Sequence, residues 1–119
     1  MIFLIDDDPI QNLLTSQLIE NANLGREFRI FNNGLEALDI IKSGVTPSVI
    51  LLDINMPIMD GWEFLEHYTK EDTAAEVYIL TSSSSGIDLA KADQFACVKG
   101  YYTKPINIYT IKGIFESDG

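Results

Sequence analysis

The sequence predicts an α/β fold in which five parallel strands form one sheet that is covered by helices on both faces. Short apolar runs alternate along the chain with segments in which apolar residues recur every three or four positions. One run, Ser48–Leu52, is almost continuously apolar, as is typical of a strand buried on both faces of a parallel sheet. Strands and helices in alternation favour right-handed crossovers, and hence a doubly wound (βα)5 sheet.

The first third of the chain predicts a strand, a helix and a second strand. The apolar run Ile2–Ile5 predicts the first strand. Asp8 and Pro9 then suit the start of a helix, because aspartate caps free backbone N–H groups and proline fits the first helical position. Apolar residues continue this helix at helical spacing: Ile10, Leu13, Leu14 and Leu18. The alternation at Phe28–Ile30 predicts a half-exposed edge strand.

The middle of the chain contains two capping boxes, each of which predicts the start of a helix. Asn33 pairs with Glu36 in the first box, and Asp60 pairs with Glu63 in the second. The helix after the first box is expected to end near Gly44, since glycine favours helix ends. Apolar residues follow both boxes at helical spacing: Leu35, Leu38 and Ile41, then Phe64, Leu65 and Tyr68.

The last third of the chain predicts two more strands, Glu76–Thr81 and Val98–Thr103, and two more helices, Ile87–Phe95 and Asn107–Glu116. A length of 119 residues fits one domain and leaves little room for a second. We therefore expect residues 1–119 to form a single domain.

The composition excludes several classes of function. A formal net charge of −10 disfavours direct binding to nucleic acid or to anionic lipid. The longest apolar runs, Met1–Ile5 and Val49–Leu52, are far shorter than the roughly 20 residues that span a bilayer, so no membrane insertion is expected. The single cysteine, Cys97, cannot form an internal disulfide and is expected to be a buried apolar residue. These features predict a cytoplasmic protein.

Polar residues stand where the predicted strands end. Asp6 and Asp7 follow the first strand, Asp53 the third, Thr81 ends the fourth and Lys104 follows the fifth. Ligands of such sheets bind beyond the carboxyl ends of the strands, so these side chains are expected to share one crevice. Three carboxylates repel one another unless a cation is present, and oxygen ligands without a His or Cys cluster favour Mg²⁺.

The same residues suit a phosphoryl group, whose transfer depends on positioning and on neutralising its oxygens. Lys104 supplies an ammonium and Thr81 supplies a hydroxyl. Asp53 ends the most buried strand, and it is therefore the best placed of the three carboxylates to act as the nucleophile.

Four motifs carry these residues in order: Ile-Asp6-Asp7-Asp8-Pro9, Leu-Leu-Asp53-Ile-Asn-Met-Pro-Ile-Met-Asp-Gly61, Leu-Thr81-Ser82 and Tyr101-Tyr-Thr-Lys104-Pro105. Together they resemble the receiver domain of bacterial two-component response regulators, and the match runs from Met1 to about Glu116. The resemblance implies a flavodoxin-like strand order, 2-1-3-4-5. It also implies a phosphoacceptor signalling switch, not an enzyme, although such a domain assists its own Mg²⁺-dependent phosphorylation and dephosphorylation.

The resemblance implies a role for each residue of the crevice. Asp53 would receive a phosphoryl group from the phosphohistidine of a sensor histidine kinase or a phosphotransfer protein. Asp7 and Asp53 would bind Mg²⁺ directly, Asp6 would act largely through water, and the main-chain carbonyl of Asn55 would be a further ligand. In the family, the residue two positions after the acceptor, here Asn55, influences how long the phosphoryl group persists, as does the residue two positions after Thr81, here Ser83.

The resemblance also implies how the signal leaves the crevice. Thr81 would bond a phosphoryl oxygen, Lys104 would pair with the phosphoryl group, and Tyr101 would be the aromatic switch residue. The surface formed by the helix Ile87–Phe95, the strand Val98–Thr103 and the last helix would then change and control a downstream protein. The Lys104-Pro105 peptide bond is expected to be cis.

Two alternatives come from other classes of protein. A haloacid-dehalogenase-like phosphatase also has Asp-x-Asp after its first strand, here Asp6 and Asp8, but it needs an acidic pair after its lysine. Only Glu116 and Asp118 follow Lys104. A flavodoxin-like FMN module needs a hydroxyl- and glycine-rich loop after the first strand, where this chain has three aspartates.

No output domain is visible, so we expect a stand-alone receiver, with a domain excised from a longer chain as the alternative.

Overall fold

The computed structural model describes residues 1–71, 74–82 and 86–116. The strands are β1 (Ile2–Ile5), β2 (Phe28–Phe31), β3 (Val49–Leu52), β4 (Glu76–Thr81) and β5 (Val98–Thr103). The helices are α1 (Pro9–Asn21), α2 (Gly34–Lys42), α3 (Gly61–Tyr68), α4 (Gly86–Ala92) and α5 (Ile108–Glu116). Ser83 and Asp118, which the sequence analysis singled out, lie outside the described residues.

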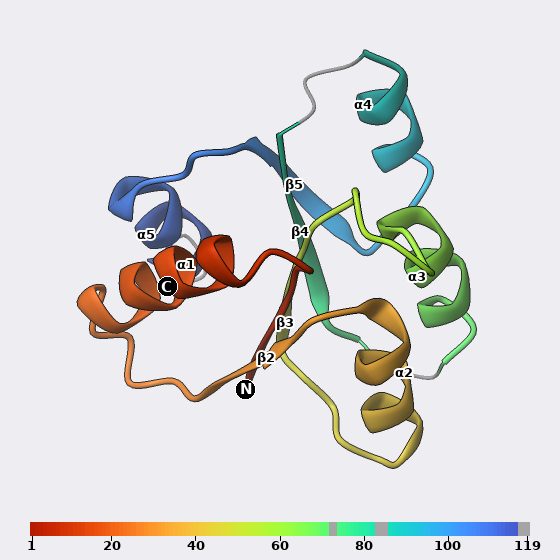
Figure 1. Ribbon diagram of the computed structural model, residues 1–119, viewed down its shortest axis with the longest axis horizontal. Helices are drawn as coiled ribbons and strands as arrows, with labels where there is room; N and C mark the ends of the chain where they lie inside the picture. Colours follow the sequence, from red (N-terminus) through yellow and green to blue (C-terminus); the bar gives the residue numbers. More distant parts are fainter. Residues whose placement is uncertain (72–73, 83–85, 117–119) are drawn as a thin grey trace.

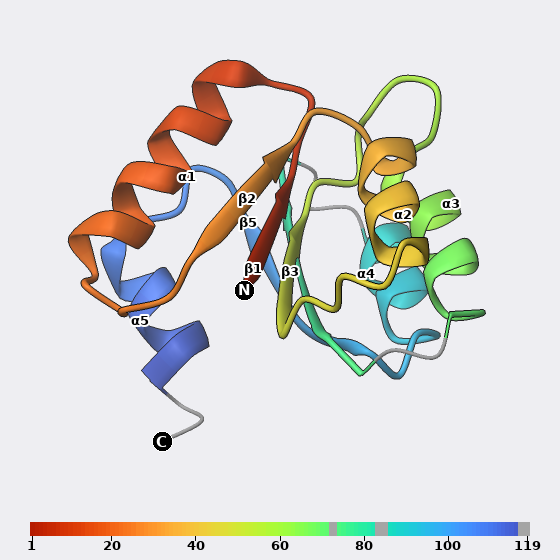
Figure 2. The same ribbon diagram turned by 90° about the horizontal axis from the view of Figure 1, so that it is seen from below.

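The five strands form one sheet in the order β2-β1-β3-β4-β5, and each pair of neighbours is parallel. Helices α1 and α5 cover one face of this sheet, and α2, α3 and α4 cover the other (Figures 1 and 2). The predicted α/β class, the doubly wound arrangement and the strand order are therefore confirmed.

The central strands are buried on both faces and contribute to two separate cores. In β1, Phe3 and Ile5 belong to the core beneath α2, α3 and α4, whereas Ile2 and Leu4 belong to the core beneath α1 and α5. This alternation follows from the two-residue period of a strand. A strand packed on both faces has little freedom to move, so residues at its end are held firmly.

Three predicted helix caps are present. Asp8, Asn33 and Asp60 each accept a hydrogen bond from a backbone N–H two or three residues later, at 2.9 Å. Gly44 lies just beyond the end of α2 with a φ of 109°, a left-handed conformation that favours glycine. Among the described residues, no helix is both long enough and apolar enough to cross a bilayer.

Two expectations need correction. Helix α4 ends at Ala92, three residues earlier than predicted, because the chain leaves the helix in a turn in which the Phe95 N–H bonds the Ala92 carbonyl at 3.1 Å. Cys97 is half-buried rather than fully buried, and it packs against the core beneath α2, α3 and α4.

Helix α1 turns several of its apolar side chains towards solvent and buries mainly polar ones. Its spacing of apolar residues predicts a helix, and the helix is present, but Ile10, Leu13 and Leu14 are 66%, 57% and 48% exposed. The side chains that α1 buries are instead Asn12, Thr15, Ser16 and Ile19. One contact helps to fix this orientation. The Asn12 amide donates a hydrogen bond to the Asp6 carbonyl at the end of β1, which holds the Asn12 side of the helix against the sheet.

Candidate functional site

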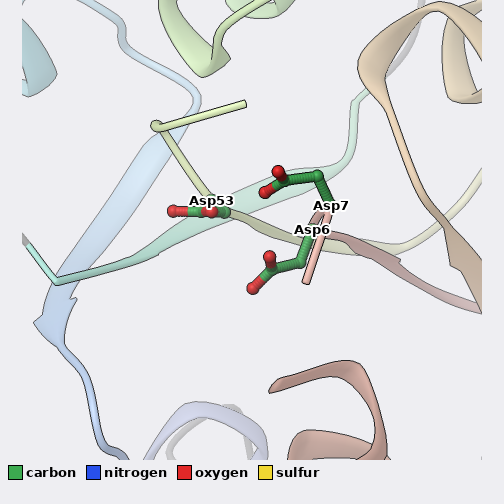
Figure 3. A group of neighbouring side chains, drawn as sticks. All are labelled: Asp6, Asp7 and Asp53. Carbon is green, nitrogen blue, oxygen red and sulfur yellow. The ribbon is translucent and has the colours of Figure 1, made fainter. Parts of the chain in front are cut away.

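The ends of β1 and β3 bring three carboxylates together. Ile5 and Leu52 are partners in the parallel ladder, so the residues that follow them, Asp6 and Asp53, are neighbours across the strand ends. The Asp53 N–H extends this ladder by donating to the Ile5 carbonyl at 2.9 Å. One carboxylate oxygen from each of Asp6, Asp7 and Asp53 lies within 4.8 Å of the others, and Figure 3 shows these side chains gathered beyond the strands.

The carboxylates line a pocket of about 710 Å³ at the carboxyl edge of the sheet. Asp53 is only 6% exposed and Asp6 is also buried, whereas Asp7 is exposed. Further lining comes from Gln11 on α1, from Ser82 after β4 and from Pro105. A small molecule entering from solvent therefore meets Asp7 at the rim and Asp53 at the bottom.

Lys104 is the positive charge beside this cluster. Its Nζ forms an ion pair with Asp6 Oδ2 and lies 3.7 Å from Asp53 Oδ2. The other oxygen of Asp6 accepts the Asp8 N–H at 2.9 Å, so both Asp6 oxygens already have partners. The Lys104-Pro105 peptide bond is cis, as the resemblance implied.

Thr81 was expected to share the crevice with the carboxylates, but it is not among the residues that line the pocket, because its side chain is fully buried beneath it, at the end of β4. Asn55, in the loop after Asp53, donates from Nδ2 to Thr81 Oγ1 at 3.5 Å and from its backbone N–H to Asp53 Oδ1 at 3.4 Å. The Thr81 carbonyl accepts the Lys104 N–H at 2.7 Å. Thr81 therefore links the acceptor loop to the segment after β5.

Tyr101 lies farther from the carboxylates, on β5. It is half-buried against the core beneath α2, α3 and α4, and it pairs with Ile79 of β4 in the ladder. With Leu89 and Ala92 of α4 it lines a small pocket of about 130 Å³. Its side chain is thus at the boundary between β5 and α4.

The loop after Asp53 and the start of α3 contain two features whose structural roles sequence reasoning missed. A Cβ on Gly61 would lie 2.8 Å from the Asp53 carbonyl oxygen, so only glycine fits there without moving the acceptor loop. Ile58 has a φ of 71° and is 79% exposed. A β-branched residue in this left-handed region is strained, and such strain is concentrated at functional sites. Neither feature has a signal in the pattern of apolar residues.

Burial raises the pKa of Asp53 from an ordinary 3.8 to about 6. The negative charge of Asp6 adds to this increase, and the positive charge of Lys104 opposes it. Removal from water is therefore a larger cause than repulsion between carboxylates. At neutral pH the Asp53 side chain is still mainly a carboxylate, and its raised pKa makes it a stronger base than an exposed aspartate.

We expect the metal-free protein to be more stable at about pH 5 than at about pH 7.5. A folded pKa of about 6 lies above the unfolded value of 3.8, so the stabilisation is complete below about pH 4 and is lost as pH rises through 6. Between pH 5 and pH 7.5 this shift should lower the free energy of unfolding by about 1.4 kcal/mol, roughly half of its full effect. Urea denaturation in EDTA at both pH values measures it.

Asp53→Asn is the control for this pH dependence, because it removes the titrating group and leaves the neighbouring charges of Asp6, Asp7 and Lys104 in place. The difference between the two pH values should shrink in this variant. An equal difference in both proteins would assign the pH dependence to other carboxylates.

Comparisons with known proteins agree with this geometry. A family model described as the response regulator receiver domain matches residues 2–116. The chemotaxis protein CheY of Halobacterium salinarum is 33% identical over 105 residues, which cover 87% of this chain and 83% of that protein. A crystal structure of a two-component response regulator from Cytophaga hutchinsonii has a TM-score of 0.83 and 29% identity, and the match covers 98% of this chain and 93% of that one.

Some relatives are longer than this chain. The probable C4-dicarboxylate response regulator DctR of Priestia megaterium is 28% identical over 115 residues. That match covers 97% of this chain but only 50% of DctR.

Proposed function

Because the chain belongs to the response regulator receiver domain family, we propose that it is a phosphoacceptor switch of two-component signalling. Residues 1–119 would form one receiver domain that works in the cytoplasm. Receiver domains of this family are signalling switches and not conventional enzymes. The observation that carries the proposal is the position of Asp53, which is buried at the bottom of a pocket between two further carboxylates and a lysine.

The residues of the pocket fit a magnesium ion. Asp6, Asp7 and Asp53 offer oxygen donors within 4.8 Å of one another, and the described residues that line the pocket include no histidine or cysteine. Hard oxygen donors suit Mg²⁺ better than a zinc-like ion. When bound, Mg²⁺ would offset the repulsion between carboxylates and neutralise charge on a phosphoryl group. Asp7, Asp53 and the Asn55 carbonyl would bind it directly.

Asp6 would act largely through water, and its contacts support that role. One of its oxygens accepts a backbone N–H, and the other pairs with Lys104. Direct binding of a cation by Asp6 would compete with these two partners. Asp7 is exposed, and among the described residues it forms no ion pair that would compete with a bound cation.

Phosphoryl transfer to Asp53 needs one bond to form and one to break. A carboxylate oxygen of Asp53 would attack the phosphorus of a phosphohistidine, while the P–N bond breaks and its electron pair stays on the imidazole nitrogen. Lys104 Nζ is 3.7 Å from Asp53 Oδ2, so it would be close enough to contact the incoming phosphoryl oxygens. Its charge would stabilise the negative charge that they carry. The product is an aspartyl phosphate, from which water later removes the phosphoryl group.

We propose a sensor histidine kinase or a phosphotransfer protein as the donor. The exposed apolar side chains of α1, which include Ile10, Leu13 and Leu14, support a protein donor, because Pro9 and Gln11 of the same helix line the pocket. A protein that covers this face would have access to Asp53. Neither nucleic acid nor a membrane is proposed as a direct partner.

The downstream target would bind at the surface formed by α4, β5 and α5. Ile87 and Leu89 on α4 and Tyr109 on α5 are exposed apolar side chains on this surface. Tyr101 lies beside α4, so a change in its position would alter the same surface. Thr81 and Tyr101 would together carry the change from Asp53.

Phosphorylation by acetyl phosphate should require Mg²⁺ and should depend on Asp7. Asp7→Ala is expected to weaken Mg²⁺ binding at least about tenfold, since even residues that merely support a metal ligand contribute about that much. Calorimetry measures the affinity. Mass spectrometry after incubation with acetyl phosphate measures the gain of one phosphoryl group, with Mg²⁺ or with EDTA.

Asp60→Asn is the control, because it also removes one negative charge but is not among the residues that line the pocket, and asparagine retains the capping function. Its Mg²⁺ affinity should stay close to that of the wild type. If Asp7→Ala binds Mg²⁺ as tightly as the wild type, the proposed metal role of Asp7 is wrong.

A further inference from the structure

Asn12 is a buried amide on α1, next to the strand end that carries Asp6 and Asp7. Its side chain lies on the inward face of α1 and is 4% exposed. Its Nδ2 donates to the main-chain carbonyl of Asp6 at 2.8 Å. Its Oδ1 is the one buried side-chain polar atom, among those that the structure describes, without a hydrogen-bond partner.

The carbonyl that Asn12 holds belongs to the peptide unit that joins Asp6 to Asp7. A peptide unit is planar, so a hydrogen bond to its oxygen restrains the whole plane. The Asp6 and Asp7 side chains leave the main chain at the two ends of that unit. A restraint on this plane therefore restrains the directions of both carboxylates at once.

Other contacts of Asp6 act on different atoms. Its N–H donates to the Phe31 carbonyl at 3.1 Å, and its carboxylate contacts the Asp8 N–H and Lys104. These contacts position Asp6 but not Asp7, whose side chain is exposed. The hydrogen bond from the Asn12 amide is thus the contact through which the buried side of α1 can fix the direction of the exposed Asp7 carboxylate.

The unpartnered Oδ1 indicates that Asn12 is not placed there for stability alone. A buried acceptor without a hydrogen bond is destabilising, because it has lost its contacts with water and gained none in return. That loss opposes the stabilisation from the bond that Nδ2 makes. A residue that contributes little net stability at a buried position, and that contacts a proposed metal-binding segment, is a candidate for a functional role.

We infer that Asn12 is a positioning residue, which orients the Asp6–Asp7 peptide unit and thereby sets the affinity of the pocket for a divalent cation. The inference rests on the proposed function, because it takes Asp6 and Asp7 as residues that hold the cation. Asn12 does not itself contact the cation or the phosphoryl group in this role. It acts only through the main chain of Asp6.

The test compares Asn12→Leu with the wild type, using Mg²⁺ alone as the probe. Leucine has a similar size and keeps the helix but cannot donate to the Asp6 carbonyl. Calorimetry should show Mg²⁺ affinity reduced about tenfold, as for other residues that orient metal ligands. Phosphorylation by acetyl phosphate should need more Mg²⁺ but should reach nearly the wild-type rate at saturation.

Thr15→Val is the matched control, because Thr15 is equally buried on the same face of α1, at 4% exposed. Its Mg²⁺ affinity should be unchanged, whatever the effect on the melting temperature. Equal loss of affinity in both variants, or wild-type affinity in Asn12→Leu, would overturn the inference. Should Asn12→Leu fail to fold, Asn12→Ala removes the same amide without adding apolar volume and takes its place.

The wild-type measurement separates this inference from the proposed function. If the wild type binds Mg²⁺ and Asn12→Leu binds it equally well, only the role of Asn12 is wrong. If the wild type binds no Mg²⁺ at millimolar concentration, the proposed metal site and the role of Asn12 are both overturned.

Discussion

Asp53→Asn is expected to abolish phosphorylation by acetyl phosphate, with no gain of a phosphoryl group detectable by mass spectrometry. Asparagine has nearly the same shape as aspartate, but its neutral amide cannot act as the nucleophile. Asp53 is buried at the bottom of the pocket, and Lys104 Nζ lies 3.7 Å from its Oδ2. Asp6 is equally buried, but both of its carboxylate oxygens already have partners, and Asp7 is exposed. Substitution of Asp53 should therefore leave no equivalent acceptor.

The control for this experiment is Asp60→Asn, which changes an aspartate in the segment that follows the acceptor loop. Asp60 caps α3 by accepting the Glu63 N–H at 2.9 Å, and asparagine is an equally good cap. This variant should be phosphorylated at the wild-type rate. A phosphoryl group on Asp53→Asn at the normal rate would show that another residue is the acceptor.

Thr81→Ala is expected to leave Asp53 phosphorylatable and to remove the response of the α4–β5–α5 surface. A phosphoryl group adds close to two negative charges and three acceptor oxygens beside Asp53. A ligand shifts a conformational equilibrium only by its differential affinity for the two states, so some contact must carry the coupling. The Thr81 hydroxyl is fully buried beside Asn55, and the Thr81 carbonyl accepts the Lys104 N–H. Movement of Thr81 towards the phosphoryl group would therefore displace neighbouring main chain.

Amide exchange or NMR with and without beryllofluoride, a mimic of the phosphoryl group, measures this response. In the wild type, we expect changes in α4 and β5, including Tyr101, as well as near Asp53. In Thr81→Ala, we expect the changes near Asp53 to remain and those in α4 and β5 to fall to near the noise of the measurement.

Thr103→Ala is the matched control, because Thr103 is the ladder partner of Thr81 on β5 but is exposed. Its response should match that of the wild type. If α4 and β5 respond equally in the wild type and in Thr81→Ala, the coupling does not run through the Thr81 hydroxyl.

The elements of the fold could be predicted from the sequence because their signals are local. Apolar runs predicted the strands, and the caps at Asp8, Asn33 and Asp60 predicted three helix starts that the structure contains. The clustering of Asp6 and Asp53 was predictable too, since parallel strands end at the same edge of a sheet. These inferences need only the type of each element and the direction of its neighbours.

Other features could not be predicted, because they depend on residues that are distant in sequence. Periodicity predicted α1, but the packing of that helix against the sheet and α5 decided that Asn12 and Thr15 face inward while Leu13 faces solvent. The raised pKa of Asp53 has burial as its largest cause, and burial is a property of the assembled layers. The sequence by itself therefore determined which elements form and which strand ends carry charge. Only the tertiary structure decided which faces are buried and how far each charge is removed from water, because a side chain's environment is set by every element packed around it.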